Sequence, residues 1–177
     1  MNKKENWLNQ HQQLIHERRS VRHFVGRPLS TELIDTILEA GRWAPSGLNN
    51  QPWRFAVIQE PQLKLKIAEL TKYHKIIETA PAIICVFLDN NALYHREKDI
   101  QSIGAALQNM LLMAHSLGLG AVWLGEILKN GAKLGNILEL PTRYELMAVV
   151  AVGYPAPTPQ SLPASRKPLA DLVLLRR

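Results

Sequence analysis

Runs of apolar residues divide the chain into segments of strand and helix length. Trp53–Gln59 (WRFAVIQ) is rich in aromatic and β-branched residues and predicts a strand. Ala82–Leu88 (AIICVFL) is apolar throughout, which is typical of a strand buried on both faces. Met147–Val152 predicts a further buried strand, and Ala121–Leu124 a short one.

Helical spacing of apolar positions fills the segments between these strands. The longest predicted helix, Asp99–Leu117, is apolar or small nearly all round, which indicates burial. Ser30 is a suitable N-cap for an amphipathic helix that ends near Pro45. Further helices are expected after Pro61, over Ala132–Leu138 and, with a polar sequence, over Trp7–Ile15. Because helices and strands alternate, the pattern by itself suggests an α/β fold with a partly parallel sheet.

Length and composition favour one globular domain over residues 1–177. Within it we expect a lead-in helix at 1–17 and, because five prolines between 155 and 168 forbid a regular helix, a C-terminal arm at 155–177. Hydrophobic residues make up 46% and charged residues 20% of the chain, values that argue against disorder and coiled coil. No apolar run reaches the roughly 20 residues of a membrane helix.

The cysteine and histidine content argues against a disulfide and against a metal site. The single cysteine, Cys85, allows no intrachain disulfide, and its place in an apolar strand predicts an inert thiol. The six histidines lack paired-ligand spacing, so no metal site is expected. With no signal-peptide core at the N-terminus, the sequence favours a cytoplasmic protein.

The net charge of +6 makes an anionic partner plausible, and nucleic acid, phosphate and nucleotide cofactors all qualify. Basic residues crowd both ends of the chain. They are Arg18, Arg19, Arg22 and Arg27 near one end and Arg166, Lys167, Arg176 and Arg177 near the other. Two basic ends around an apolar middle favour a defined anion site over a binding tail.

Two polar motifs suit recognition of a charged, ring-bearing ligand. Guanidinium groups as dense as those of Arg18–Arg22 (RRSVR) repel one another unless an anion neutralises them, although a solvated basic surface is the alternative. Ala44–Trp53 (APSGLNNQPW) places several amides in a stiff loop, which suits a ring with carbonyls and nitrogens. An ordinary turn would use the same residue types.

Two glycine-containing motifs follow later in the chain. In Leu117–Gly125 (LGLGAVWLG) a glycine after the short strand permits close approach of the backbone to a ligand. The segment is no GxGxxG fingerprint, because its glycines follow a helix, and a tight helix-to-strand connection explains it equally well. Gly153–Pro155 (GYP) leads through the arm to Arg166–Leu169 (RKPL), a second basic pair that could close on the same anion.

Together, in this order, the four motifs resemble the nitroreductase family of FMN-dependent oxidoreductases, from Arg18 to Val173. The resemblance implies an α+β fold with a mixed central sheet flanked by helices. It also implies an intertwined homodimer with FMN at each of two interface sites, without nucleic acid or membrane partners.

The resemblance also assigns cofactor-binding residues by position. Phosphate ligands are expected from the basic ends, with Lys167 a weaker candidate, while the 44–53 loop would reach the flavin of the partner subunit. The expected set is Arg18, Arg19, Ser20, Arg22 and Arg166 for the phosphate, Pro45, Ser46 and Asn49 for the partner's flavin, and Trp123, Leu124 and Gly125 beside the other flavin face. A backbone N–H near Gly125 and Glu126 would meet flavin N5.

The implied activity is hydride transfer from NADH or NADPH to FMN and then to nitroaromatic or quinone acceptors, by ping-pong kinetics. No side chain is assigned as a general acid or base. Two departures stand out: a long lead-in before Arg18, and a short 89–98 connection, which predicts an open, tolerant acceptor site. Reductive dehalogenation, flavin fragmentation, a non-enzymatic flavin-binding redox sensor and, last, a nucleic-acid module remain alternatives.

Overall fold

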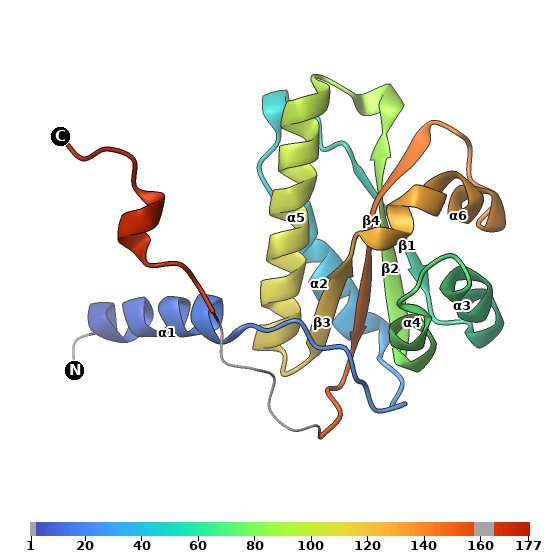
Figure 1. Cartoon of the computed structure of the whole chain (residues 1–177), viewed down its shortest axis with the longest axis horizontal. Coiled ribbons are helices and arrows are strands. Elements are labelled where there is room, and N and C mark those ends of the chain that lie inside the picture. The colour runs from blue at the N-terminus through green and yellow to red at the C-terminus, as the bar shows by residue number, and fades with distance from the viewer. Residues whose placement is uncertain (1–2, 158–164) are drawn as a thin grey trace.

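A four-stranded sheet forms the centre of the computed structural model, which describes residues 3–157 and 165–177 (Figure 1). The strands are β1 (Trp53–Ile58), β2 (Ala82–Asp89), β3 (Gly120–Leu124) and β4 (Tyr144–Gly153), in the spatial order β1-β2-β4-β3. Every residue of β2 is buried, as its apolar sequence predicts. All four predicted strands are confirmed, and β4 begins earlier than expected.

Helices cover both faces of the sheet, so side chains that alternate along the strands enter two separate cores. Ile84 and Val150 pack with Met110 on one face, whereas Ile83 and Val149 pack with Ile77 on the other. The first face carries α2 (Thr31–Arg42) and α5 (Arg96–Ser116); the second carries α3 (Pro61–Ala68), α4 (His74–Thr79) and α6 (Gly131–Ile137) (Figure 1). Ser30 caps α2 as predicted, since its Oγ accepts a hydrogen bond from the Leu33 N–H at 3.4 Å.

Strand direction corrects one expectation drawn from the alternating pattern. All three pairings among the four strands are antiparallel, so the prediction of a partly parallel α/β sheet is wrong and the α+β class is confirmed. The physical reason lies between β1 and β2, where two helices return the chain to the end at which β1 stops, pairing Ile58 with Ile83. The second of these helices, α4, was not predicted. One parallel bridge joins Ser20 to Ala121, outside the named strands.

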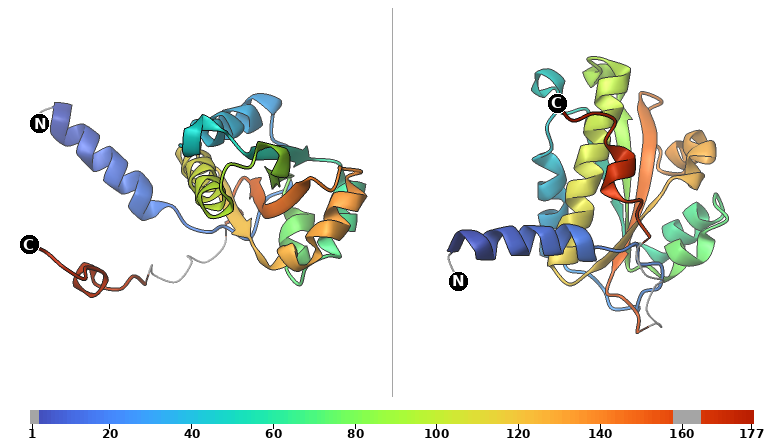
Figure 2. Two further views of the ribbon diagram at one scale, coloured as in Figure 1. Left: turned by 90° about the horizontal axis from the view of Figure 1, so that it is seen from above. Right: turned by 60° about the vertical axis from the view of Figure 1, so that its left-hand side comes forward.

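The two ends of the chain extend from the same side of the body (Figure 2). α1 (Lys3–Glu17) spans the expected lead-in, and residues 165–177 contain a 3-10 turn, η4 (Leu169–Leu172). Part of the expected arm, residues 158–164, lies outside the described residues. Within the described ranges, no helix is long and apolar enough to cross a membrane, and no three His, Cys, Asp or Glu side chains are grouped as metal ligands.

Candidate functional site

The RRSVR segment lies directly against β3, so the first and third motifs form one structural unit. The Val21 N–H donates to the Ala121 carbonyl at 3.0 Å, beside the bridge of Ser20 to Ala121. A Cβ at Gly120 would lie 2.6 Å from Val21 Cβ, which real side chains do not tolerate. Gly120 therefore lets the basic segment approach the strand, a packing role within the chain rather than a contact with a ligand.

The basic residues from the two ends of the chain converge in space. Arg18 is half-buried, and burial together with the positive charges of Arg166 and Arg19 lowers its pKa. Arg19 donates from Nη1 to the carbonyl oxygens of His16 and, at 3.1 Å, of Arg18. Among the described residues, no carboxylate forms an ion pair with any of the three arginines. We call Arg18, Arg19 and Arg166 the arginine cluster; its uncompensated charge favours an anion.

A small hollow of about 240 Å³ lies at the carboxyl end of β3. It brings together Arg22 and Trp123–Gly125, which the sequence places a hundred residues apart. Leu124 is buried, whereas the Trp123 side chain is 45% exposed. A Cβ at Gly125 would meet no atom within 4 Å, so the chain leaves open space above this glycine.

Tyr73, which precedes α4, also lines this hollow, and no sequence motif pointed to it. The residues just before Tyr73 are tied to the end of β3 through Glu126, which accepts hydrogen bonds from the Thr71 hydroxyl at 2.6 Å and the Lys72 N–H at 3.3 Å. Hydrogen bonds from Lys129, Thr71 and Lys72 lower the pKa of Glu126 to about 2. No motif marked Tyr73, because this contact depends on how α3 and α4 return the chain.

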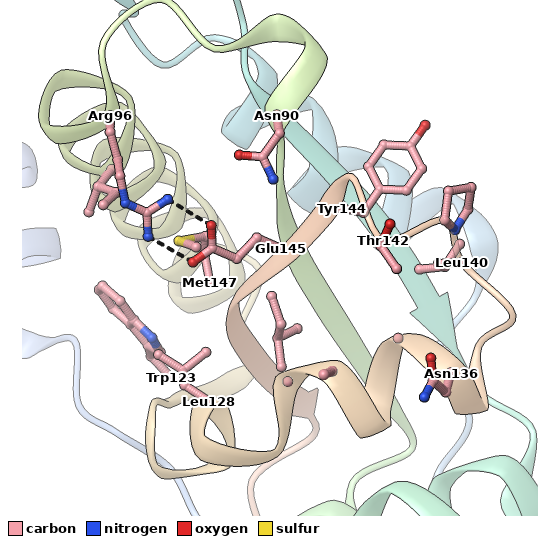
Figure 3. A pocket seen from close by; sticks show the side chains of 16 residues that line it. Asn90, Arg96, Trp123, Leu128, Asn136, Leu140, Thr142, Tyr144, Glu145 and Met147 are labelled. Carbon is pink, nitrogen blue, oxygen red and sulfur yellow. Dashed lines mark hydrogen bonds and ion pairs between the residues drawn. The ribbon is translucent and has the colours of Figure 1, made fainter.

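A larger groove of about 730 Å³ adjoins the hollow, and the Trp123 side chain belongs to the wall of both (Figure 3). Its lining is largely apolar and includes Ile100, Leu128 and Met147. Arg96 and Glu145 form a two-pronged ion pair at one side, with nitrogen–oxygen distances of 2.7 and 2.8 Å. The groove is thus a separate surface that touches the hollow at one residue.

The APSGLNNQPW segment, residues 44–53, forms a stiff loop that we call the amide loop. Ser46 Oγ accepts from the Gln51 N–H at 3.0 Å, and the Ser46 carbonyl accepts from the Asn49 N–H at 3.1 Å. Leu48, Asn49 and Gln51 have φ angles of 53°, 56° and 47°. Left-handed backbone in non-glycine residues costs of order 1–3 kcal/mol each and is typical of functional loops.

The amide loop and the arginine cluster lie at opposite ends of α5. Asn50 hydrogen-bonds to Asp99 in the first turn of this helix, whereas Ala121 follows its last turn and pairs with Ser20. A helix of 21 residues is roughly 30 Å long. Within one chain, the structure therefore does not bring Pro45, Ser46 and Asn49 to the arginine cluster.

The chain matches the nitroreductase family over residues 15–73 and 61–154. A solved structure of a protein assigned as a nitroreductase from Desulfovibrio desulfuricans, in complex with FMN, is similar with a TM-score of 0.86 and 49% identity, over 94% of this chain and 96% of that one. A Methanothermobacter thermautotrophicus protein assigned as NADH dehydrogenase/NAD(P)H nitroreductase is 36% identical over 147 residues, 82% of this chain and 77% of its own. Iodotyrosine deiodinase of Haliscomenobacter hydrossis is 30% identical over 176 residues, covering 81% and 78%. These matches show that the chain is a member of the nitroreductase family.

Proposed function

We propose that this protein is an FMN-dependent oxidoreductase that takes hydride from NADH or NADPH and reduces quinone-type or nitroaromatic acceptors. The observation that carries the proposal is the arginine cluster, in which both ends of the chain supply positive charge without a described carboxylate to neutralise it. Guanidinium forks match phosphate oxygens in bidentate geometry. The terminal phosphate of FMN fits this donor set.

The hollow at the end of β3 fits the ring system of the same cofactor. Trp123 and Leu124 supply apolar surface, and the open space at Gly125 lets a flat ligand approach the backbone. Bound FMN supplies the hydride-transfer chemistry at its ring. The chain's part is to bind the phosphate, to orient the ring along Trp123–Glu126 and to offer backbone N–H groups at Gly125 and Glu126.

A second copy of the chain completes the proposed site. The amide loop lies about one α5 length from the arginine cluster of its own chain, so Pro45, Ser46 and Asn49 serve the flavin of the partner subunit. Residues 165–177 support the same proposal, because four of their leucines are exposed to solvent. Leu174 is fully exposed, and Leu169, Leu172 and Leu175 are each more than 60% exposed. Apolar residues in this arrangement favour an obligate interface.

The acceptor site is proposed to be open and tolerant of flat, electron-poor molecules. Between β2 and α5 the chain has only a short connection with one 3-10 turn, η2 (Asn90–Ala92), which leaves no room for a capping helix. One open flavin face would be used in turn by NAD(P)H and acceptor, giving ping-pong kinetics. We expect kcat/KM to vary modestly across unrelated quinones and nitroarenes; an acceptor preferred by several orders of magnitude would contradict an open site.

Reductive dehalogenation is the second candidate, suggested by the deiodinase relative. The alignment with that relative runs over 176 positions but covers only 81% of these 177 residues, so the relative has segments that this chain lacks. The nitroreductase relative aligns over 147 positions and 82% of the chain, nearly without such segments. The chain therefore aligns more continuously with the nitroreductase relative than with the deiodinase, and reductive dehalogenation stands second.

The decisive experiment is purification followed by reduction without air. The protein should be yellow, release FMN and not FAD on denaturation, and lose its flavin colour within minutes of adding NADH or NADPH. A colourless protein whose thermal unfolding FMN does not shift would overturn the assignment, because a ligand of the native state must stabilise it. Bound FMN that neither NADH nor NADPH reduces would favour the redox sensor.

A further inference from the structure

The short connection between β2 and α5 braces the amide loop. A Cβ at Gly47 would lie 2.8 Å from a ring carbon of Tyr94, so the loop backbone rests on this ring. Asn50 donates from Nδ2 to the Ala92 carbonyl at 2.8 Å and to Asp99 Oδ1 at 2.9 Å. The hydrogen bonds between the connection and the loop are thus made by the Asn50 side chain.

Asp99 is a fully buried carboxylate at this junction. Its Oδ2 accepts from the N–H groups of Tyr94 at 2.8 Å and His95 at 2.9 Å, while Oδ1 takes the Asn50 amide. Burial alone would raise the pKa of Asp99, but the hydrogen bonds from Asn50, His95 and Tyr94 outweigh it and hold the pKa below its usual range. Asp99 is therefore a charged acceptor that ties the start of α5 to the loop.

Asn50 lies in the strained part of the loop, where the hydrogen bonds of its side chain help to hold the backbone in place. It has ordinary helical backbone angles (φ −71°, ψ −16°) between Asn49 and Gln51, both of which have positive φ. Its Oδ1 is buried without a hydrogen-bond donor among the described residues, so only the two donations from Nδ2 fix the amide. Backbone in left-handed regions persists only when its surroundings hold it there.

We propose that Asn50 and Asp99 are positioning residues that set the geometry of the amide loop against the flavin of the partner subunit. This proposal rests on the proposed function. Neither side chain touches the flavin; they act through Ser46 and Asn49, which the same strained loop carries. Because a displacement of about 1 Å at a reacting centre can cost up to about 100-fold in rate, the brace controls flavin reactivity rather than flavin retention.

Two substitutions separate a hydrogen-bond donor from a packing group. Asn50→Asp keeps the shape but places a carboxylate against Asp99, whereas Asn50→Ala removes the side chain. Asn109→Ala is the matched control, because Asn109 is also half-buried and donates to a distant carbonyl, that of Ala40, at 3.1 Å. All proteins are studied as FMN-loaded dimers.

The positioning role predicts a specific order of effects. Asn50→Asp should change the visible circular dichroism of bound flavin most and slow its reoxidation by a quinone roughly 10-fold or more, Asn50→Ala should have a smaller effect, and Asn109→Ala none. FMN affinity should change little, since the arginine cluster is intact. If Asn50→Asp behaves like the wild type, or is milder than Asn50→Ala, the positioning role is wrong. A wild-type protein that binds no FMN would instead refute the proposed function.

Discussion

At the scale of single residues, the arginine cluster allows binding and folding to be separated. Arg18→Ala and Arg166→Ala should each weaken FMN binding by roughly 10- to 100-fold, because a charge-assisted hydrogen bond contributes about 1.5–3 kcal/mol. Burial and, after it, the positive charges of Arg166 and Arg19 lower the pKa of Arg18. The apo protein should be no less stable, since each change relieves the repulsion between these charges. Thermal unfolding with and without FMN measures both effects.

Arg143→Ala is the control for this pair of variants. It also removes one exposed guanidinium, but this group already donates to the Tyr144 hydroxyl and forms an ion pair with Asp89. It should leave FMN affinity unchanged. Wild-type affinity in both Arg18→Ala and Arg166→Ala would mean that the cluster does not hold the phosphate.

Trp123 offers an optical test of where the ring system binds. The indole is 45% exposed at the hollow, so a flavin there would quench its fluorescence by contact and energy transfer. FMN titration should quench wild-type tryptophan emission strongly, and Trp123→Phe should lose the largest share of that change while still binding FMN. Equal quenching in the two proteins would place the flavin elsewhere.

At the scale of elements, two glycines at opposite ends of β3 should respond differently to alanine. Gly120→Ala forces a Cβ to within 2.6 Å of Val21 and should lower the free energy of unfolding by about 1–3 kcal/mol. Gly125→Ala places its Cβ in open space at an ordinary φ of −98°, so the apo protein should keep its stability. If the flavin fills that space, FMN affinity should fall in this variant.

Chemical denaturation and FMN titration of both variants check this contrast. Loss of stability in Gly125→Ala would show that the space beside this glycine is not open. Unchanged FMN affinity together with unchanged stability would show that the flavin does not use it.

How far the sequence predicts these elements depends on how local each signal is. The apolar run of β2 and the Ser30 cap of α2 are local patterns, and the structure has both. Strand direction is not local: it follows from the α3–α4 pair, which the alternating pattern does not reveal. The same distinction holds for the site. Arg22 and Trp123 lie in local sequence motifs and could be predicted. Tyr73 and the contact of Asn50 with Asp99 could not, because they depend on segments that meet only after folding.

At the scale of the whole molecule, the arm should hold the dimer together. Ending the chain after Lys167 removes Leu169, Leu172, Leu174 and Leu175 but keeps Arg166. Because burial of each leucine contributes roughly 2 kcal/mol, the shortened protein should dissociate on dilution and lose flavin, whereas the full chain stays dimeric at micromolar concentration.

Sedimentation velocity across a dilution series measures this difference. Replacing Arg176 and Arg177 with alanine in the full chain is the control, since it alters charge in the same segment but keeps the leucines. A shortened chain as stably dimeric as the full one would show that the leucines of the arm do not hold the dimer together.

The separation of the amide loop from the arginine cluster along α5 has a genetic consequence. Two inactive chains, one with Arg18→Ala and Arg166→Ala and the other with Asn49→Ala, should complement each other when co-expressed. In their mixed dimer, one of the two flavin sites would carry every substitution and the other site would carry none. The mixed dimer should therefore have about half the turnover of the wild-type dimer, although neither parent chain forms a working site by itself. Complementation of this kind requires that each catalytic unit be drawn from two polypeptides.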